Sequence, residues 1–122
     1  MGKESFQIGI TGEIIAVEYL TQKGLSVIDR NFHSQQGEID IIAKDGDIIV
    51  FVEVKYYSFR SYGSPLGSVR KSKRQSIIHA AQTFLYKKNL RQINCRFDVI
   101  SIYRDSGGKT NIDYIKDAFY VN

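Results

Sequence analysis

The sequence predicts a single-domain α/β sandwich, in which helices flank a mixed central sheet. Two segments carry apolar residues at helical spacing, and five short segments are rich in β-branched and aromatic residues. They follow one another in the order α-β-β-β-α-β-β. A chain of 122 residues without an internal repeat or a linker rich in Pro or Ser suits one compact domain over 1–122.

The first helix is expected to begin at Thr11, a plausible N-cap, and to end before Gly24. Its apolar positions, spaced for one helix face, are Ile14, Ile15, Val17 and Leu20. Residues 25–28 predict a short strand, and the polar run DRNFHSQQG that follows is typical of a turn.

Residues 37–57 contain two apolar runs separated by KDGD, which predicts a tight β-hairpin. The Gly/Ser-rich stretch 58–68 predicts a loop. A second helix with a densely basic first half is expected from about Val69, and its core positions are Ile77, Ile78, Ala81, Phe84 and Leu85. Strands are then expected at 96–104 and 110–116 around the turn DSGGK.

Composition excludes several classes of protein. A single cysteine, Cys95, cannot form an internal disulfide, and with the two separated histidines His33 and His79 it cannot build a zinc cluster. No run of apolar residues is long enough to cross a bilayer, and the N-terminus lacks the pattern of a signal peptide. We therefore expect a cytoplasmic protein with no membrane partner, in which any metal ion is held by oxygen.

Charge is distributed unevenly along the chain. The segment 54–97 has no Asp or Glu and contains ten basic residues, namely Lys55, Arg60, Arg70, Lys71, Lys73, Arg74, Lys87, Lys88, Arg91 and Arg96. The rest of the chain has seven basic and thirteen acidic residues, a net charge of −6. Such a run can be a solvated face, but aromatic residues between the cations favour a nucleic-acid partner, whose phosphates pair with cations and whose bases stack on rings.

The hairpin strands place charged residues among apolar ones. Because side chains alternate between the faces of a strand, Asp40 shares a face with Ile42, and Glu53 shares one with Lys55. A loop of residues 45–46 would put Asp40 diagonal to Glu53, whereas a loop of residues 46–47 would put it directly opposite. Either register brings the two Cβ atoms to about 5 to 8 Å, but a three-residue loop would separate the faces.

Two interpretations of this acidic pair remain open from spacing alone. Carboxylates so close repel each other unless a cation lies between them, and Mg²⁺ and Mn²⁺ prefer such oxygen ligands. Alternatively, Lys55 forms a structural salt-bridge set with Asp40 and Glu53.

The spacing of Asp40, followed after twelve residues by Glu53-Val54-Lys55, resembles the PD-(D/E)XK nuclease motif, with Ile39 in place of the Pro. The run from TGEIIAVEYL to FVEVK, the GSPLGSV stretch and RFDVISI together resemble the YraN family of small bacterial proteins, distant relatives of archaeal Holliday junction resolvases. The resemblance implies a restriction-endonuclease-like core and a Mg²⁺- or Mn²⁺-dependent endonuclease acting on branched or structured DNA. DNA is expected as the nucleic-acid partner in preference to RNA. A homodimer is compatible with the resemblance.

The resemblance also implies roles for individual residues. Asp40, Glu53, the Val54 carbonyl and Glu13 would hold the metal, and Lys55 would act on the attacking water or the phosphate. Phosphate contacts are expected from the basic residues Arg60, Arg70, Lys71, Lys73 and Arg74. For Glu38 a hydrogen-bond or ion-pair role is expected rather than a metal-ligand role, and Arg96 with Asp98 is also compatible with a simple ion pair. The competing functions are a nucleic-acid-binding protein without catalysis and a structural interaction module.

Overall fold

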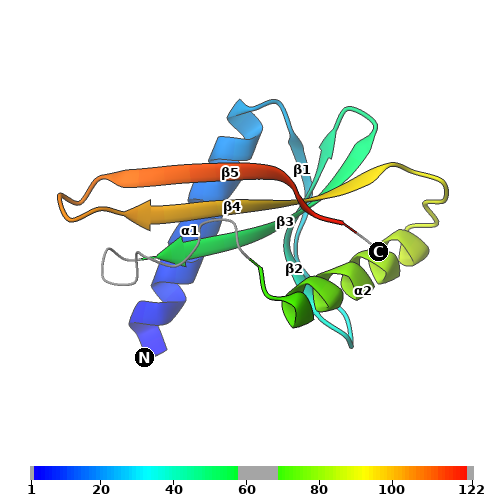
Figure 1. The fold of residues 1–122 in the computed structure, drawn as a ribbon, viewed down its shortest axis with the longest axis horizontal. Helices are drawn as coiled ribbons and strands as arrows, with labels where there is room; N and C mark the ends of the chain where they lie inside the picture. The colour runs from blue at the N-terminus through cyan, green and yellow to red at the C-terminus, as the bar shows by residue number, and fades with distance from the viewer. Residues whose placement is uncertain (1, 58–68, 121–122) are drawn as a thin grey trace.

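A computed structural model describes residues 2–57 and 69–120, with the side chains of 2–11 and Tyr57 left out of the description. In chain order, the elements are α1 (Gly2–Gln22), β1 (Ser26–His33), β2 (Glu38–Asp45), β3 (Ile48–Tyr57), α2 (Lys71–Lys87), β4 (Cys95–Arg104) and β5 (Thr110–Phe119) (Figure 1). The predicted order α-β-β-β-α-β-β is confirmed.

The strands form one five-stranded sheet in the order β1-β2-β3-β4-β5. Neighbours pair antiparallel except β3 and β4, which run parallel because α2 carries the chain back between them. The predicted mixed sheet is therefore confirmed. The first three strands form a meander, so the β2–β3 hairpin lies in the middle of the sheet.

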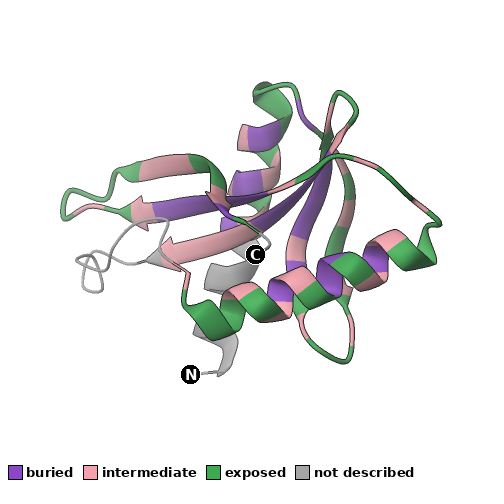
Figure 2. Cartoon of the chain, turned by 45° about the vertical axis from the view of Figure 1, so that its right-hand side comes forward, coloured by how far each residue is buried: buried purple, intermediate pink, exposed green. Residues whose placement is uncertain are grey.

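The two helices lie on opposite faces of the sheet. On one face, Ala16 and Leu20 of α1 pack against residues such as Ile41 and Val52. On the other face, Ile77 and Phe84 of α2 pack with a second cluster that includes Phe51. Figure 2 shows the buried residues concentrated in the central strands and on the inner sides of the helices. Alternation explains this division along β3 and along residues 41–43 of β2, whereas Ile39 departs from it and joins Ile42 in the cluster that packs with α2.

The β2–β3 turn settles the register. Asp45 pairs with Ile48, so Gly46 and Asp47 are the two loop residues. Gly46 has φ of +60°, and a positive φ at the first loop position suits a type II′ hairpin turn, where glycine is favoured. Of the two predicted registers, the one that places Asp40 opposite Glu53 is confirmed.

Two boundaries predicted from sequence were wrong. The helix α1 begins at Gly2 rather than Thr11, because an isolated glycine costs a helix only about 1 kcal/mol and the residues before Thr11 include good helix formers. The strand β1 continues to His33 through the stretch predicted as a turn. Asn31 there has φ of +53°, a conformation that Asn tolerates, and pairing with β2 continues to His33 and Glu38. The loop predicted for 58–68 lies outside the described residues.

Helix α1 approaches the sheet closely at Gly12. A Cβ atom built there would lie 2.8 Å from Cδ2 of Tyr56 on β3, so a larger residue would force one of the two to move. This contact brings the helix turn that carries Glu13 against the end of β3. Within the described residues, no helix is both long enough and apolar enough to cross a membrane.

Candidate functional site

The candidate site lies where β2 and β3 separate. Backbone pairing of the two strands extends to Ile41 and Val52, and the next positions are Asp40 and Glu53. There the Oδ2 atom of Asp40 accepts a hydrogen bond from the backbone N–H of Val54 at 2.8 Å. A side chain thus takes the position of a backbone partner, and the two carboxylates lie together on the α2 side of the sheet.

Glu53 is largely buried beside Asp40. Its side chain is only 12% exposed. Burial, and then the charge and hydrogen bonding of Asp40, raise the pKa of Glu53 to about 8, while Lys73 and Lys55 oppose that rise. Near neutral pH the site therefore holds a carboxyl group that is only partly ionised, and a cation placed beside it would favour the ionised form.

Two lysines approach Glu53 from different elements. Lys55 follows it by two residues on the same face of β3, and burial lowers the pKa of Lys55 although the charge of Glu53 opposes the change. Lys73, in the first turn of α2, has its Nζ atom 3.8 Å from Oε2 of Glu53. The predicted grouping of Asp40, Glu53 and Lys55 is present, and the structure adds Lys73 to it.

The direction in which the Val54 carbonyl points follows from the hydrogen bonding of β3. The N–H group of Ile49 donates to the carbonyl of Asn94, just before β4, whereas that of Val54 donates to Asp40 on β2. In a β-strand the N–H and C=O groups of one residue point the same way, so the Val54 carbonyl also faces the side from which β2 departs. Its role as a metal ligand stays a prediction.

Glu13 is positioned differently from the other predicted ligands. It lies on α1, on the opposite face of the sheet from α2, with Oε1 3.6 Å from Nη2 of Arg30. That oxygen is buried and has no hydrogen-bond partner among the residues the structure describes. The structure does not gather Glu13 with Asp40 and Glu53 into one site.

The donor set suits a hard divalent cation. Across residues 2–57 and 69–120, no three His, Cys, Asp or Glu side chains form a group able to hold a metal ion. Mg²⁺, however, typically takes one or two carboxylates and completes its shell with water and phosphate oxygens. The Asp40–Glu53 pair, with a main-chain carbonyl nearby, fits that requirement.

The predicted phosphate-binding residues lie mostly at the start of α2. Arg70 is the N-cap residue, and Lys71, Lys73 and Arg74 follow it in a first turn that contains no acidic residue. Arg60 lies outside the described residues. The basic start of α2 is adjacent to the carboxylates through the contact of Lys73 with Glu53, so cations and carboxylates form one continuous site.

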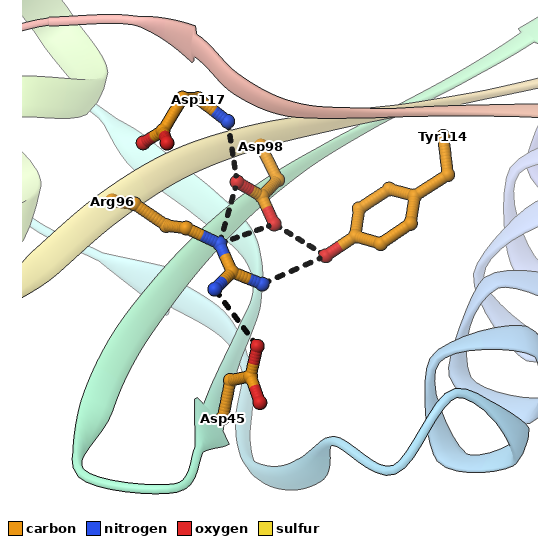
Figure 3. A network of polar contacts seen from close by, with 5 residues as sticks. All are labelled: Asp45, Arg96, Asp98, Tyr114 and Asp117. Atoms are coloured by element: carbon orange, nitrogen blue, oxygen red, sulfur yellow. Dashed lines mark hydrogen bonds and ion pairs between the residues drawn. The ribbon is translucent and has the colours of Figure 1, made fainter.

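A second polar cluster lies apart from this site (Figure 3). Asp98 is fully buried and accepts hydrogen bonds from Nε of Arg96 at 3.1 Å, from the Tyr114 hydroxyl and from the Asp117 N–H at 3.0 Å. Nη1 of Arg96 also reaches Asp45 at 2.8 Å. Of the two explanations considered for Arg96 and Asp98, the ion pair is present in the structure. Sequence reasoning missed Tyr114 and Asp45, which only the sheet register brings to this pair.

Glu38 has the role expected of it. Its Oε2 lies 3.0 Å from Nδ1 of His33 across the β1–β2 pair. Both side chains are largely exposed, so this contact lies on the protein surface at the end of the β1–β2 pair.

Fold and site together define a class of protein: a small α/β domain with paired carboxylates and lysines at the centre of a mixed sheet. The family model that matches residues 12–102 is described as "Uncharacterised protein family UPF0102". A UPF0102 protein of Clostridium tetani is 47% identical over 122 residues, 99% of this chain and 100% of its own length. One from Geotalea uraniireducens is 45% identical over 112 residues, 92% and 88% of the two chains. The chain belongs to the UPF0102 family, which confirms the resemblance to the YraN family.

Proposed function

We propose that the chain is a metal-dependent endonuclease that hydrolyses phosphodiester bonds in branched or structured DNA. The observation that supports it most is the pair of carboxylates, Asp40 and Glu53, that meet where two strands separate. A protein gains little stability from a buried acid whose pKa is raised to about 8, so such a group is a candidate for function. The proposal includes a restriction-endonuclease-like core and membership of the PD-(D/E)XK nuclease superfamily.

In this proposal, Asp40 and Glu53 would hold Mg²⁺ or Mn²⁺ together with the Val54 carbonyl. The bound cation would supply positive charge for the phosphate and lower the pKa of a water molecule. Oδ2 of Asp40 already accepts the N–H of Val54, which holds this carboxylate against β3 and orients it. Orientation by a main-chain donor prepares the side chain before any ligand arrives.

The lysines would act on the phosphate. Burial lowers the pKa of Lys55, which brings its amine closer to proton transfer with the attacking water and keeps it beside Glu53. Lys73 lies 3.8 Å from Glu53, and 43% of its side chain is exposed to solvent. An entering phosphate would therefore find a cation within reach at the edge of the site.

A second candidate function, a nucleic-acid-binding protein without catalysis, is favoured by one observation. The contact of Lys73 with Glu53 partly neutralises the acid without any metal, and the raised pKa of Glu53 allows it to be protonated near neutral pH. The basic start of α2 would then serve for docking alone. The two functions differ in whether the carboxylates bind a cation and whether DNA is cut.

A cleavage screen decides between them. Labelled linear, flapped and four-way-junction DNA would be incubated with the protein and Mn²⁺, with RNA of the same sequences beside them. We expect cleavage of branched DNA that falls about a hundredfold or more in Asp40→Asn and Lys55→Ala. The matched control is Asp47→Asn, which removes an exposed acid at the turn of the same hairpin. If every substrate is bound but none is cut, the non-catalytic function is the correct one.

A further inference from the structure

A groove follows the outer flank of α2. Five strands make a sheet about 19 Å wide, whereas one helix with its side chains covers about 10 Å. Helix α2 packs mainly over β1 and β2 and therefore lies off-centre on that face of the sheet. The resulting groove, of about 810 Å³, lies between α2 and the last residues of β5.

The lining of this groove combines cations, amides and aromatic rings. Lys71, Arg74, His79 and Gln82 come from α2, Phe119 is the last residue of β5, and Tyr120 follows it. Among the residues that the structure describes, no acidic side chain lines it. Neither basic residue forms an ion pair with any acid in the described ranges.

The aromatic residues have different roles. Phe119 is buried and stacks on Phe97 with ring centroids 5.0 Å apart, so its ring belongs to the core and forms an apolar floor. Tyr120, by contrast, is 70% exposed. An exposed ring beside unpaired cations is the combination that proteins use to bind unpaired nucleotides, with phosphates on the cations and a base on the ring.

The groove and the candidate site both involve the first turn of α2. Lys73, which contacts Glu53, lies between Lys71 and Arg74 in sequence. From Lys71 to Gln82 the helix rises about 16 Å, a length that accommodates a few nucleotides. Successive residues of a helix are about 100° apart, so a strand that passes the carboxylates would have to round the first turn of α2 to enter the groove.

We propose that this groove binds a single-stranded segment of DNA adjoining the phosphate to be cut. Lys71 and Arg74 contact its phosphates, and Tyr120 stacks on one of its bases. A duplex does not suit the groove equally well, because its bases are already stacked on one another and offer no face to Tyr120. The continuity with the carboxylates rests on the proposed endonuclease function, but binding of the strand needs neither metal nor cleavage.

The test measures binding of a fluorescein-labelled oligothymidylate of about ten nucleotides by anisotropy, in EDTA and low salt. Tyr120→Ala removes the exposed ring and leaves the core intact. Tyr86→Ala is its matched control, because Tyr86 is an 85% exposed tyrosine on α2 that does not line this groove. We expect Tyr120→Ala to weaken binding about fivefold or more and Tyr86→Ala to leave it unchanged.

Three results would overturn the proposal: absence of oligothymidylate binding by the wild type, equal affinities of the two variants, or equally strong competition by polyglutamate. The last would indicate an acidic protein partner. These outcomes are separate from the fate of the endonuclease. Tyr120-dependent binding without DNA cleavage would leave the groove assigned and the endonuclease refuted. If DNA cleavage depends on Asp40 but Tyr120→Ala does not weaken oligothymidylate binding, the endonuclease would be supported and the groove proposal refuted.

Discussion

Asp40 accepts the backbone N–H of Val54 at 2.8 Å, at the position where β2 leaves β3. Continued pairing of the strands would have used that N–H in the ladder and closed the space between them. Replacing a main-chain acceptor with a carboxylate keeps the donor satisfied and opens one side of β3. The acid that would bind a cation is thus also the residue that completes the hydrogen bonding of the sheet.

Asp40→Asn and Asp40→Ala should differ in stability. The asparagine keeps an acceptor for the Val54 N–H and removes a charge that opposes Glu53, so we expect an unchanged or raised melting temperature. The alanine leaves that N–H without its acceptor and should destabilise the fold by about 1 to 3 kcal/mol. Thermal melts in EDTA measure both. A clear loss of stability in Asp40→Asn would show that the negative charge is needed structurally.

Millimolar Mn²⁺ should raise the melting temperature of the wild type, because a ligand that binds only the folded state stabilises it. The same addition should leave Asp40→Asn unchanged. Asp47→Asn, at the turn of the hairpin, should respond like the wild type. A wild type that is indifferent to Mn²⁺ and Mg²⁺ would contradict the metal site.

The raised pKa of Glu53 predicts how stability depends on pH. An acid with a higher pKa in the folded state holds its proton more tightly there, so its contribution is complete below the unfolded value of 4.5. It is lost as pH rises toward about 8. Relative to Glu53→Gln, the metal-free wild type should therefore lose stability between pH 5 and pH 8. Urea denaturation of both proteins across this range measures the difference.

Mn²⁺ should reduce that pH dependence, since a bound cation favours the ionised carboxylate. If the wild type and Glu53→Gln changed in parallel from pH 5 to pH 8, Glu53 would have an ordinary pKa and the site would be more hydrated than its burial indicates.

The basic start of α2 predicts a salt-dependent affinity for DNA. Each phosphate neutralised contributes about −0.9 to the slope of log affinity against log salt concentration. Lys71→Ala combined with Arg74→Ala should therefore make the slope less steep by about 2. The charge-matched control is Lys44→Ala with Lys109→Ala, two lysines outside the acid-free segment. Equal slopes for both double variants would place the DNA on another surface.

The cluster around Asp98 should contribute to stability and not to catalysis. Asp98→Ala leaves Arg96 without its buried partner and should cost about 3 to 5 kcal/mol. Tyr114→Phe removes one donor to Asp98 and should cost about 1 to 3 kcal/mol. The double variant should lose less than the sum, because both changes affect the same contact. Tyr86→Phe, which changes an exposed ring, is the control and should leave stability unchanged. Additive losses in the double variant would show that Asp98 and Tyr114 act independently.

Much of the fold could be predicted because its signals are local. Alternation in 37–57 and the Asp-Gly pair specified a hairpin, and helical spacing after Val69 specified α2. The prediction for the start of α1 failed because helix-forming residues outweigh a tolerated glycine, whereas the prediction for β1 failed because local signals there oppose long-range pairing. Asp29, Arg30 and Asn31 favour a turn, but the pairing of Asp29, Arg30, Phe32 and His33 with β2 provides hydrogen bonds that no local pattern can show.

By itself, the sequence determined the face of the hairpin on which Asp40, Glu53 and Lys55 lie, because alternation is a property of every strand. Only the tertiary structure decided which distant groups join them. Lys73 reaches Glu53 because α2 packs on the same face, whereas Glu13 lies with Arg30 because α1 packs on the other. The perturbed pKa of Glu53 has the same origin, since burial depends on what covers a side chain, and the covering residues are far away in the chain.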